Sequence, residues 1–212
     1  MNDLLLDVQR RLESLYGLDR EAPVTDFLIP EEAAATYPGG GSRTLVTQDS
    51  DGISLGVVLE GSVRDSLARI DPRVRLDASN LGPLCTLTEE VSHFLYLLYC
   101  ARVERQVTQL ALELQAEVDK YLTAALLLSL QNAGAISARL RPHLFREYRL
   151  AAGMSAERAE RYHAASQLAY HYCGYLERQF LRASRLADLA REARRFYRLG
   201  QREKLERIAE LH

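Results

Sequence analysis

The sequence lacks the motifs of several common functional classes. It has no glycine-rich phosphate loop, no serine nucleophile elbow and no pairing of cysteine with histidine, which argues against those nucleotide-binding and nucleophilic enzymes. Its three cysteines show no C-x-x-C spacing and lie in apolar, helix-like stretches, which predicts buried free thiols and a reducing compartment. Of the 27 basic residues only Lys120 and Lys204 are lysine, a bias that we attribute to genome composition.

Strong net charge and long apolar runs are also missing. The net charge of −2 gives no indication of nucleic-acid or anionic-membrane binding. The longest uncharged run, 121–138, is interrupted by several polar residues, so we interpret it as a buried helix rather than a membrane span. Acidic residues at Asp3 and Asp7 stand where a secretory signal would need basic ones. We therefore expect a cytoplasmic protein with neither nucleic-acid nor membrane partners.

The hydrophobic pattern predicts an α+β fold that is predominantly α-helical. Only one stretch alternates with period 2 around a turn signal at Asp51-Gly52, which predicts a β-hairpin. The spacing elsewhere is helical, and we expect a core over 1–132 and a helical C-terminal extension over 133–212. The expected strands are 44–48 and 53–59; the expected helices are 2–17, one from Ser62 closed by Pro72, two within 84–133 with a break at 102–105, and 136–150, 155–182 and 184–211.

The segment from Thr88 to Glu117 carries a pattern typical of a metal site. Glu89 and His93 are four residues apart, so a helix presents both side chains on one face. If the chain reverses near residue 103, the next helix runs antiparallel and brings Glu113 and Glu117 opposite His93. Glu, His and Glu around one ion leave a fourth position for water, which is the arrangement of catalytic zinc sites.

This pattern resembles that of the gluzincin metallopeptidases, which are thermolysin-like. They carry H-E-x-x-H on one helix and a third ligand in E-x-x-x-D/E on the next, and Glu113 follows His93 by twenty residues, as in the thermolysin type. The similarity covers roughly residues 1 to 131.

The resemblance implies a role for each residue. Glu89, His93 and Glu113 would be the ligands, with Glu117 a supporting carboxylate behind them. Glu90 would be the general base that activates water. The strand at 53–59 would form the cleft edge for an extended peptide. Candidate donors to a developing oxyanion are Tyr162 and His163.

This sequence departs from the family by having Glu89 where the family has histidine. The resemblance implies a divalent metal, with zinc as the first expectation. The ligand set of one histidine and two glutamates adds a negative charge and also suits iron or manganese, which are the alternatives. The same departure leaves open an inactive relative of the peptidases. Substrate or partner is expected to be a peptide or protein, and the oligomeric state is left open.

Two further interpretations compete with the peptidase. Two E-x-x-H motifs, at Glu90–His93 and Glu160–His163, with Glu113 or Glu117 and Glu13, resemble the ligands of a di-iron carboxylate bundle. Alternatively the carboxylates are structural and the protein is a non-catalytic interaction protein. In that case Glu89 caps a helix with Thr86, Glu113 and Glu117 form a solvated face with Lys120, and basic residues of 191–202 bind a partner.

Overall fold

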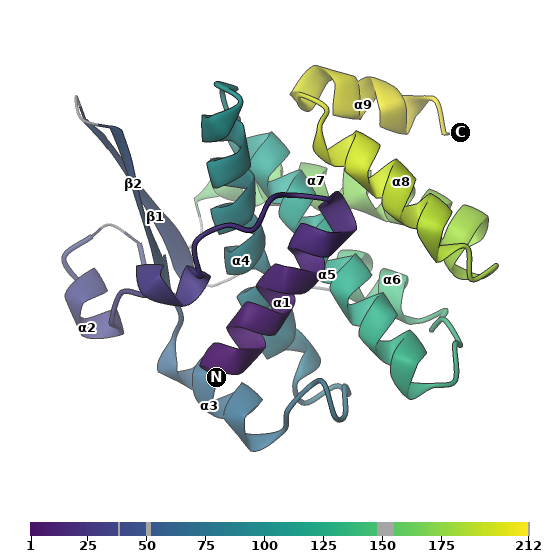
Figure 1. The fold of residues 1–212 in the computed structure, drawn as a ribbon, viewed down its shortest axis with the longest axis horizontal. Coiled ribbons are helices and arrows are strands. Elements are labelled where there is room, and N and C mark those ends of the chain that lie inside the picture. Colours follow the sequence, from purple (N-terminus) through teal and green to yellow (C-terminus); the bar gives the residue numbers. More distant parts are fainter. Residues whose placement is uncertain (38, 50–51, 148–154, 212) are drawn as a thin grey trace.

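The computed structural model describes residues 1–37, 39–49, 52–147 and 155–211, and its elements are predominantly helical (Figure 1). The hairpin lies at one end of the long axis, and α8 and α9 lie at the other. The α-helices are α1 Asn2–Tyr16, α2 Glu31–Ala34, α3 Gly61–Arg69, α4 Leu81–Arg102, α5 Gln109–Gln131, α6 Leu140–Arg146, α7 Ala156–Leu176, α8 Leu186–Tyr197 and α9 Gln201–Ala209. The other elements are the 3-10 helix Val24–Phe27, strands β1 Arg43–Asp49 and β2 Gly52–Val58, and a π-helical turn Glu177–Leu181.

Helices α4 and α5 form an antiparallel pair at the centre of the molecule. The chain reverses between Arg102 and Gln109, as the charges at 102–105 predict. Contacts confirm the direction, because His93 faces Glu113 while the earlier Glu89 faces the later Lys120. Helix α7 packs on α5, and one continuous apolar core includes side chains from α1 and from α3 through α9. The expected core and extension therefore share one hydrophobic interior.

The β-hairpin packs beside α4, and both of its strands contact that helix. The strands are antiparallel, with Thr44 opposite Val57. The edge expected to be open at 53–59 is covered at one position, because Leu28 forms a parallel bridge with Val57 and the Ile29 amide donates to the Val57 carbonyl at 2.8 Å. Among the described residues, no strand pairs with the outer edge of β1.

Arginines of α8 attach the C-terminal helices to α1. The Arg194 guanidinium donates to the carbonyls of Ser14 and Leu15 at 3.0 Å each, and Arg198 donates to Tyr16 at 3.0 Å. These carbonyls belong to the last turn of α1, where Ser14 also accepts from the Gly17 amide at 3.3 Å, and the cations complement the negative end of the helix. Arg194 and Arg198 of the basic segment 191–202 therefore form hydrogen bonds with α1 of the same chain.

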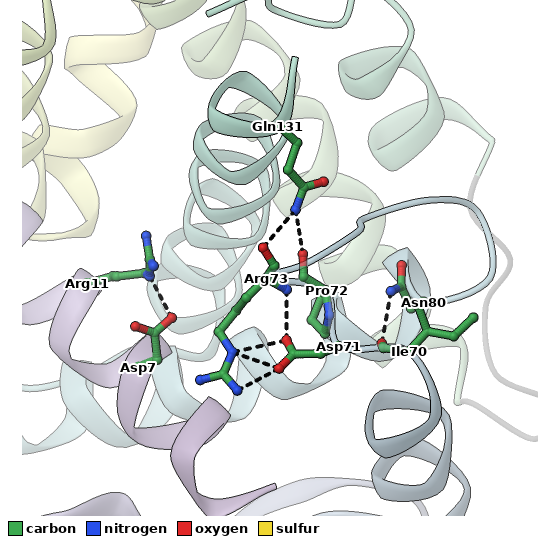
Figure 2. Close-up of polar contacts among 8 residues, drawn as sticks. All are labelled: Asp7, Arg11, Ile70, Asp71, Pro72, Arg73, Asn80 and Gln131. Carbon is green, nitrogen blue, oxygen red and sulfur yellow. Dashed lines mark hydrogen bonds and ion pairs between the residues drawn. The ribbon is translucent and has the colours of Figure 1, made fainter. Parts of the chain in front are cut away.

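The loop between α3 and α4 is fixed to the end of α5 by side-chain amides (Figure 2). Gln131 donates from Nε2 to the carbonyls of Pro72 at 2.8 Å and Arg73 at 3.2 Å. Asn80 donates to the Ile70 carbonyl at 3.1 Å, immediately before α4 begins. The start of α4 is consequently fixed relative to the end of α5, on the two helices that carry the expected ligands.

Several local expectations are confirmed and others are wrong. Ser155 accepts a hydrogen bond from the Arg158 amide and so caps α7 as expected, and the three cysteines are free. The helix expected at 184–211 is two, because Gly200 stands between α8 and α9 in an extended conformation. Ser62 does not cap α3, which begins one residue earlier. Residue 51 of the expected turn and the boundary between the helices expected at 136–150 and 155–182 fall outside the described residues.

The uncharged run 121–138 was expected to be a buried helix rather than a membrane span. Within the described ranges, no helix combines the length and the apolar character that a bilayer-spanning segment needs.

Candidate metal centre

The structure brings Glu89, His93 and Glu113 together between α4 and α5. One potential ligand atom from each lies within 4.8 Å of the others, and His93 Nε2 is 3.8 Å from Glu113 Oε2. In a tetrahedral zinc site with bonds near 2.1 Å, ligand atoms are about 3.4 Å apart. The three side chains would therefore have to close by about 1 Å to hold an ion, a movement that side-chain rotation can supply.

The imidazole of His93 is buried and incompletely satisfied. Its Nε2 is inaccessible to solvent and has no hydrogen-bond partner among the described residues. Burial lowers the pKa of His93 to about 4, although Glu89 opposes the shift. A neutral imidazole has a lone pair on one ring nitrogen. If that nitrogen is Nε2, which faces Glu113, it can bind a metal ion. A buried polar atom left unpaired costs about 1–3 kcal/mol, which a bound ion would recover.

Glu90 lies on the other side of the His93 ring. Its Oε2 accepts a hydrogen bond from Thr44 Oγ1 of β1 at 2.8 Å and lies 3.9 Å from His93 Nδ1, while His93 Nε2 faces Glu113. Burial and the charge of Glu89 raise the pKa of Glu90 to about 8. Glu90, the expected base, thus lies beside Nδ1 of His93. In metal sites a carboxylate at the ring nitrogen that does not bind the ion commonly orients the histidine.

Glu113 lies in a similar environment. Its side chain is about one-eighth exposed, and burial with the neighbouring charge of Glu89 raises its pKa to about 7. A nearby divalent cation would lower the pKa of both Glu113 and Glu90 by favouring their charged forms. The site therefore combines a neutral His93 with two carboxyl groups, Glu90 and Glu113, whose ionisation burial disfavours in the absence of a cation.

Lys120 of α5 binds the carboxylates on the α7 side of the centre. Its Nζ is 2.8 Å from Glu89 Oε2 and 2.8 Å from Glu117 Oε1, and it donates to the Tyr162 hydroxyl at 3.1 Å. Burial alone would raise the pKa of Glu89, but Lys120 and His93 lower it below its ordinary value. Glu117 is therefore near the triad, separated from it by the ammonium group.

The remaining expected site residues are not all brought together. Tyr162 reaches Lys120, whereas the neighbouring His163 is exposed on α7, as is Glu160. Glu13 accepts hydrogen bonds from Gln9 and from the backbone amide of Glu21. In the described part of the chain, Glu89, His93 and Glu113 are the only group that meets the geometric requirements for a metal site, so the di-iron ligand set is not assembled.

The structure also tests the structural explanations for these carboxylates. Helix α4 begins at Leu81, so Glu89 lies two turns inside it and cannot cap it with Thr86. Glu117 and Lys120 are paired as one alternative expected, but they are 2% and 6% exposed and form no solvated face. They therefore form a buried ion pair rather than a solvated one.

Sequence reasoning missed Thr44 and gave Lys120 only a surface role. Both lysines of the chain are buried, Lys120 in the ion cluster and Lys204 against Gln115 at 2.8 Å. In a chain that otherwise uses arginine, the two remaining lysines were a signal of specific sites. Comparison with known protein families, with curated proteins and with solved structures finds no match to this chain.

Proposed function

We propose that this protein is a metal-dependent hydrolase in which Glu89, His93 and Glu113 hold one divalent ion. The proposal rests on one observation, the convergence of two carboxylates on buried His93, whose Nε2 is unsatisfied. Zinc is the expected ion, and the oxygen-rich set also suits iron or manganese. When bound, such an ion supplies Lewis acidity and an activated water.

The substrate proposed is an extended peptide. The unpaired edge of β1 supports this choice, because an edge strand can pair with a peptide backbone. Thr44 of β1 contacts Glu90, which places that strand next to the centre. Partial exposure of Glu89 and Glu113, 23% and 13% for their side chains, gives solvent access to the ligands.

Glu90 carries two proposed roles that can be separated by experiment. As a general base it would remove a proton from water, and as the neighbour of His93 Nδ1 it would orient the imidazole. The Glu90→Gln substitution keeps an acceptor for Thr44 but removes the base. Loss of hydrolysis with unchanged zinc affinity indicates the base, whereas a 10- to 100-fold loss of affinity indicates orientation.

A second candidate function is a non-catalytic metal-binding protein. The observation that favours it is the hydrogen bond from Thr44 to Glu90, which directs that carboxylate toward Nδ1 rather than toward Nε2. In this case the ion would stabilise the α4–α5 pair, and the β1 edge would bind a partner without cleaving it.

Hydrolysis of an internally quenched peptide library tests the proposal. Zinc-loaded wild type should cleave members of the library, chelator should abolish cleavage, and His93→Ala should be inactive. His143→Ala is a matched control, because His143 is an exposed histidine paired with Glu147 outside the centre. Wild type that binds zinc but cleaves no peptide would refute the hydrolase and leave the second candidate.

A further inference from the structure

The ammonium group of Lys120 occupies a cradle of three oxygen atoms contributed by three helices. The oxygen atoms that accept its hydrogen bonds belong to Glu89 of α4, Glu117 of α5 and Tyr162 of α7, at 2.8, 2.8 and 3.1 Å from Nζ. Lys120 is only 6% exposed. Carboxylate oxygens held around a buried position are the ligands that hard divalent cations prefer in proteins.

Glu89 belongs both to this cradle and to the proposed metal centre. Its Oε2 accepts from Lys120, and a carboxylate has a second oxygen that can serve another cation. Carboxylates that are shared between two ions are common in centres with two metal ions. Glu89 thus connects the cradle to the proposed centre.

We propose that Lys120 fills the second cation position of a two-ion carboxylate site, and that its ammonium keeps the centre mononuclear. The inference deepens the proposed function, on which it rests for the first ion. It also accounts for a buried ammonium group held between Glu89, which belongs to the proposed centre, and Glu117. Removal of Lys120 leaves Glu89 and Glu117 without their cation in a buried site, which a divalent ion can then occupy.

Metal stoichiometry of Lys120 variants tests the inference. Proteins are purified with Mn²⁺, freed of unbound ion by gel filtration and measured by elemental analysis, with electron paramagnetic resonance to detect coupled ions. Wild type and Lys120→Arg, which keeps the cation, should hold about one Mn²⁺ per chain, as expected for a single metal site. Lys120→Ala should hold two, with a spin-coupled signal, and Lys120→Ala/Glu117→Gln should return to one.

The outcomes separate this inference from the proposed function. Lys120→Ala that still holds one ion, with Glu89 and Glu117 neutralised by protons or by another basic side chain, would overturn the inference and leave the first site standing. An ion bound by Lys120→Ala but not by wild type, and retained in His93→Ala/Lys120→Ala, would support the cradle and refute the proposed centre. Lys120→Ala that fails to fold with Mn²⁺ present, while Lys120→Ala/Glu117→Gln folds, would also overturn it, because the divalent ion should replace the ammonium.

Discussion

Glu90→Gln should change the pH dependence of stability in the metal-free protein. Glu90 is 3% exposed, and its folded-state pKa is about 8 against an ordinary value of 4.5. Between these two values the folded protein keeps the proton and the unfolded chain releases it. Glu90 therefore contributes a stability that is present in acid and is lost as the pH rises through this window. Glutamine is neutral in both states and has no such dependence.

The size of the effect follows from the two pKa values. Each pH unit well inside the window is worth about 1.4 kcal/mol, and slightly less near pH 8, so the stability of Glu90→Gln relative to wild type should increase by about 2.5 kcal/mol between pH 5.5 and 7.5. The comparison with the variant matters because Lys204, with a pKa lowered by burial to about 7, acts in the opposite direction above pH 7 in both proteins. The difference between the two proteins removes this contribution of Lys204.

Urea denaturation in the presence of chelator measures this difference. Unfolding free energies of wild type and Glu90→Gln are determined at pH 5.5, 6.5 and 7.5 and subtracted at each pH. Zinc added at pH 7.5 should stabilise wild type by favouring the ionised carboxylates. A difference that stays constant over this range would refute the burial of an un-ionised Glu90 in the site.

Two further predictions concern the surroundings of the site. The double substitution Arg194→Ala/Arg198→Ala should lower the free energy of unfolding by about 1–2 kcal/mol, because α1 loses the donors at its C-terminal carbonyls. Arg191→Ala, which removes only an exposed pair with an aspartate, should cost under about 0.5 kcal/mol in the same urea titration; equal losses would contradict the capping role. Gly56→Ala should destabilise the hairpin by about 1–3 kcal/mol, because the new Cβ would lie 2.2 Å from Ile29 Cδ1. Adding Ile29→Ala should offset part of that loss in a double-mutant cycle, and strictly additive effects would argue against this contact.

Much of the secondary structure could be predicted from the sequence because hydrophobic periodicity dominates it. The helix at 2–17, the hairpin and the break at 102–105 all follow from residue spacing and turn residues. The split of the last helix at Gly200 was not predicted, because the apolar spacing continues across the break. What separates α8 from α9 is the glycine N-cap, at which the Gly200 amide donates to Glu203 at 2.8 Å.

For the candidate site, the sequence could predict only which residues the helix spacing and the chain reversal bring to one place. Spacing of four places Glu89 and His93 on one face of α4, and antiparallel helices bring Glu113 to them. Spacing does not encode side-chain rotamers or how the hairpin packs on α4, so the position of Glu90 between Thr44 and His93 Nδ1 could not be derived. Nor does it show that α7 covers Lys120, which decides whether that ammonium is buried.

The central claim is that Glu89, His93 and Glu113 form a metal site, and metal content tests it most directly. Wild type, His93→Ala and the control His143→Ala are purified in parallel, incubated with zinc, freed of unbound ion and measured by elemental analysis. Wild type and His143→Ala should each retain about one zinc ion per chain, as a single three-ligand site requires, and His93→Ala should retain none. Wild type without bound zinc, iron or manganese, or His93→Ala that keeps its metal, would contradict the account.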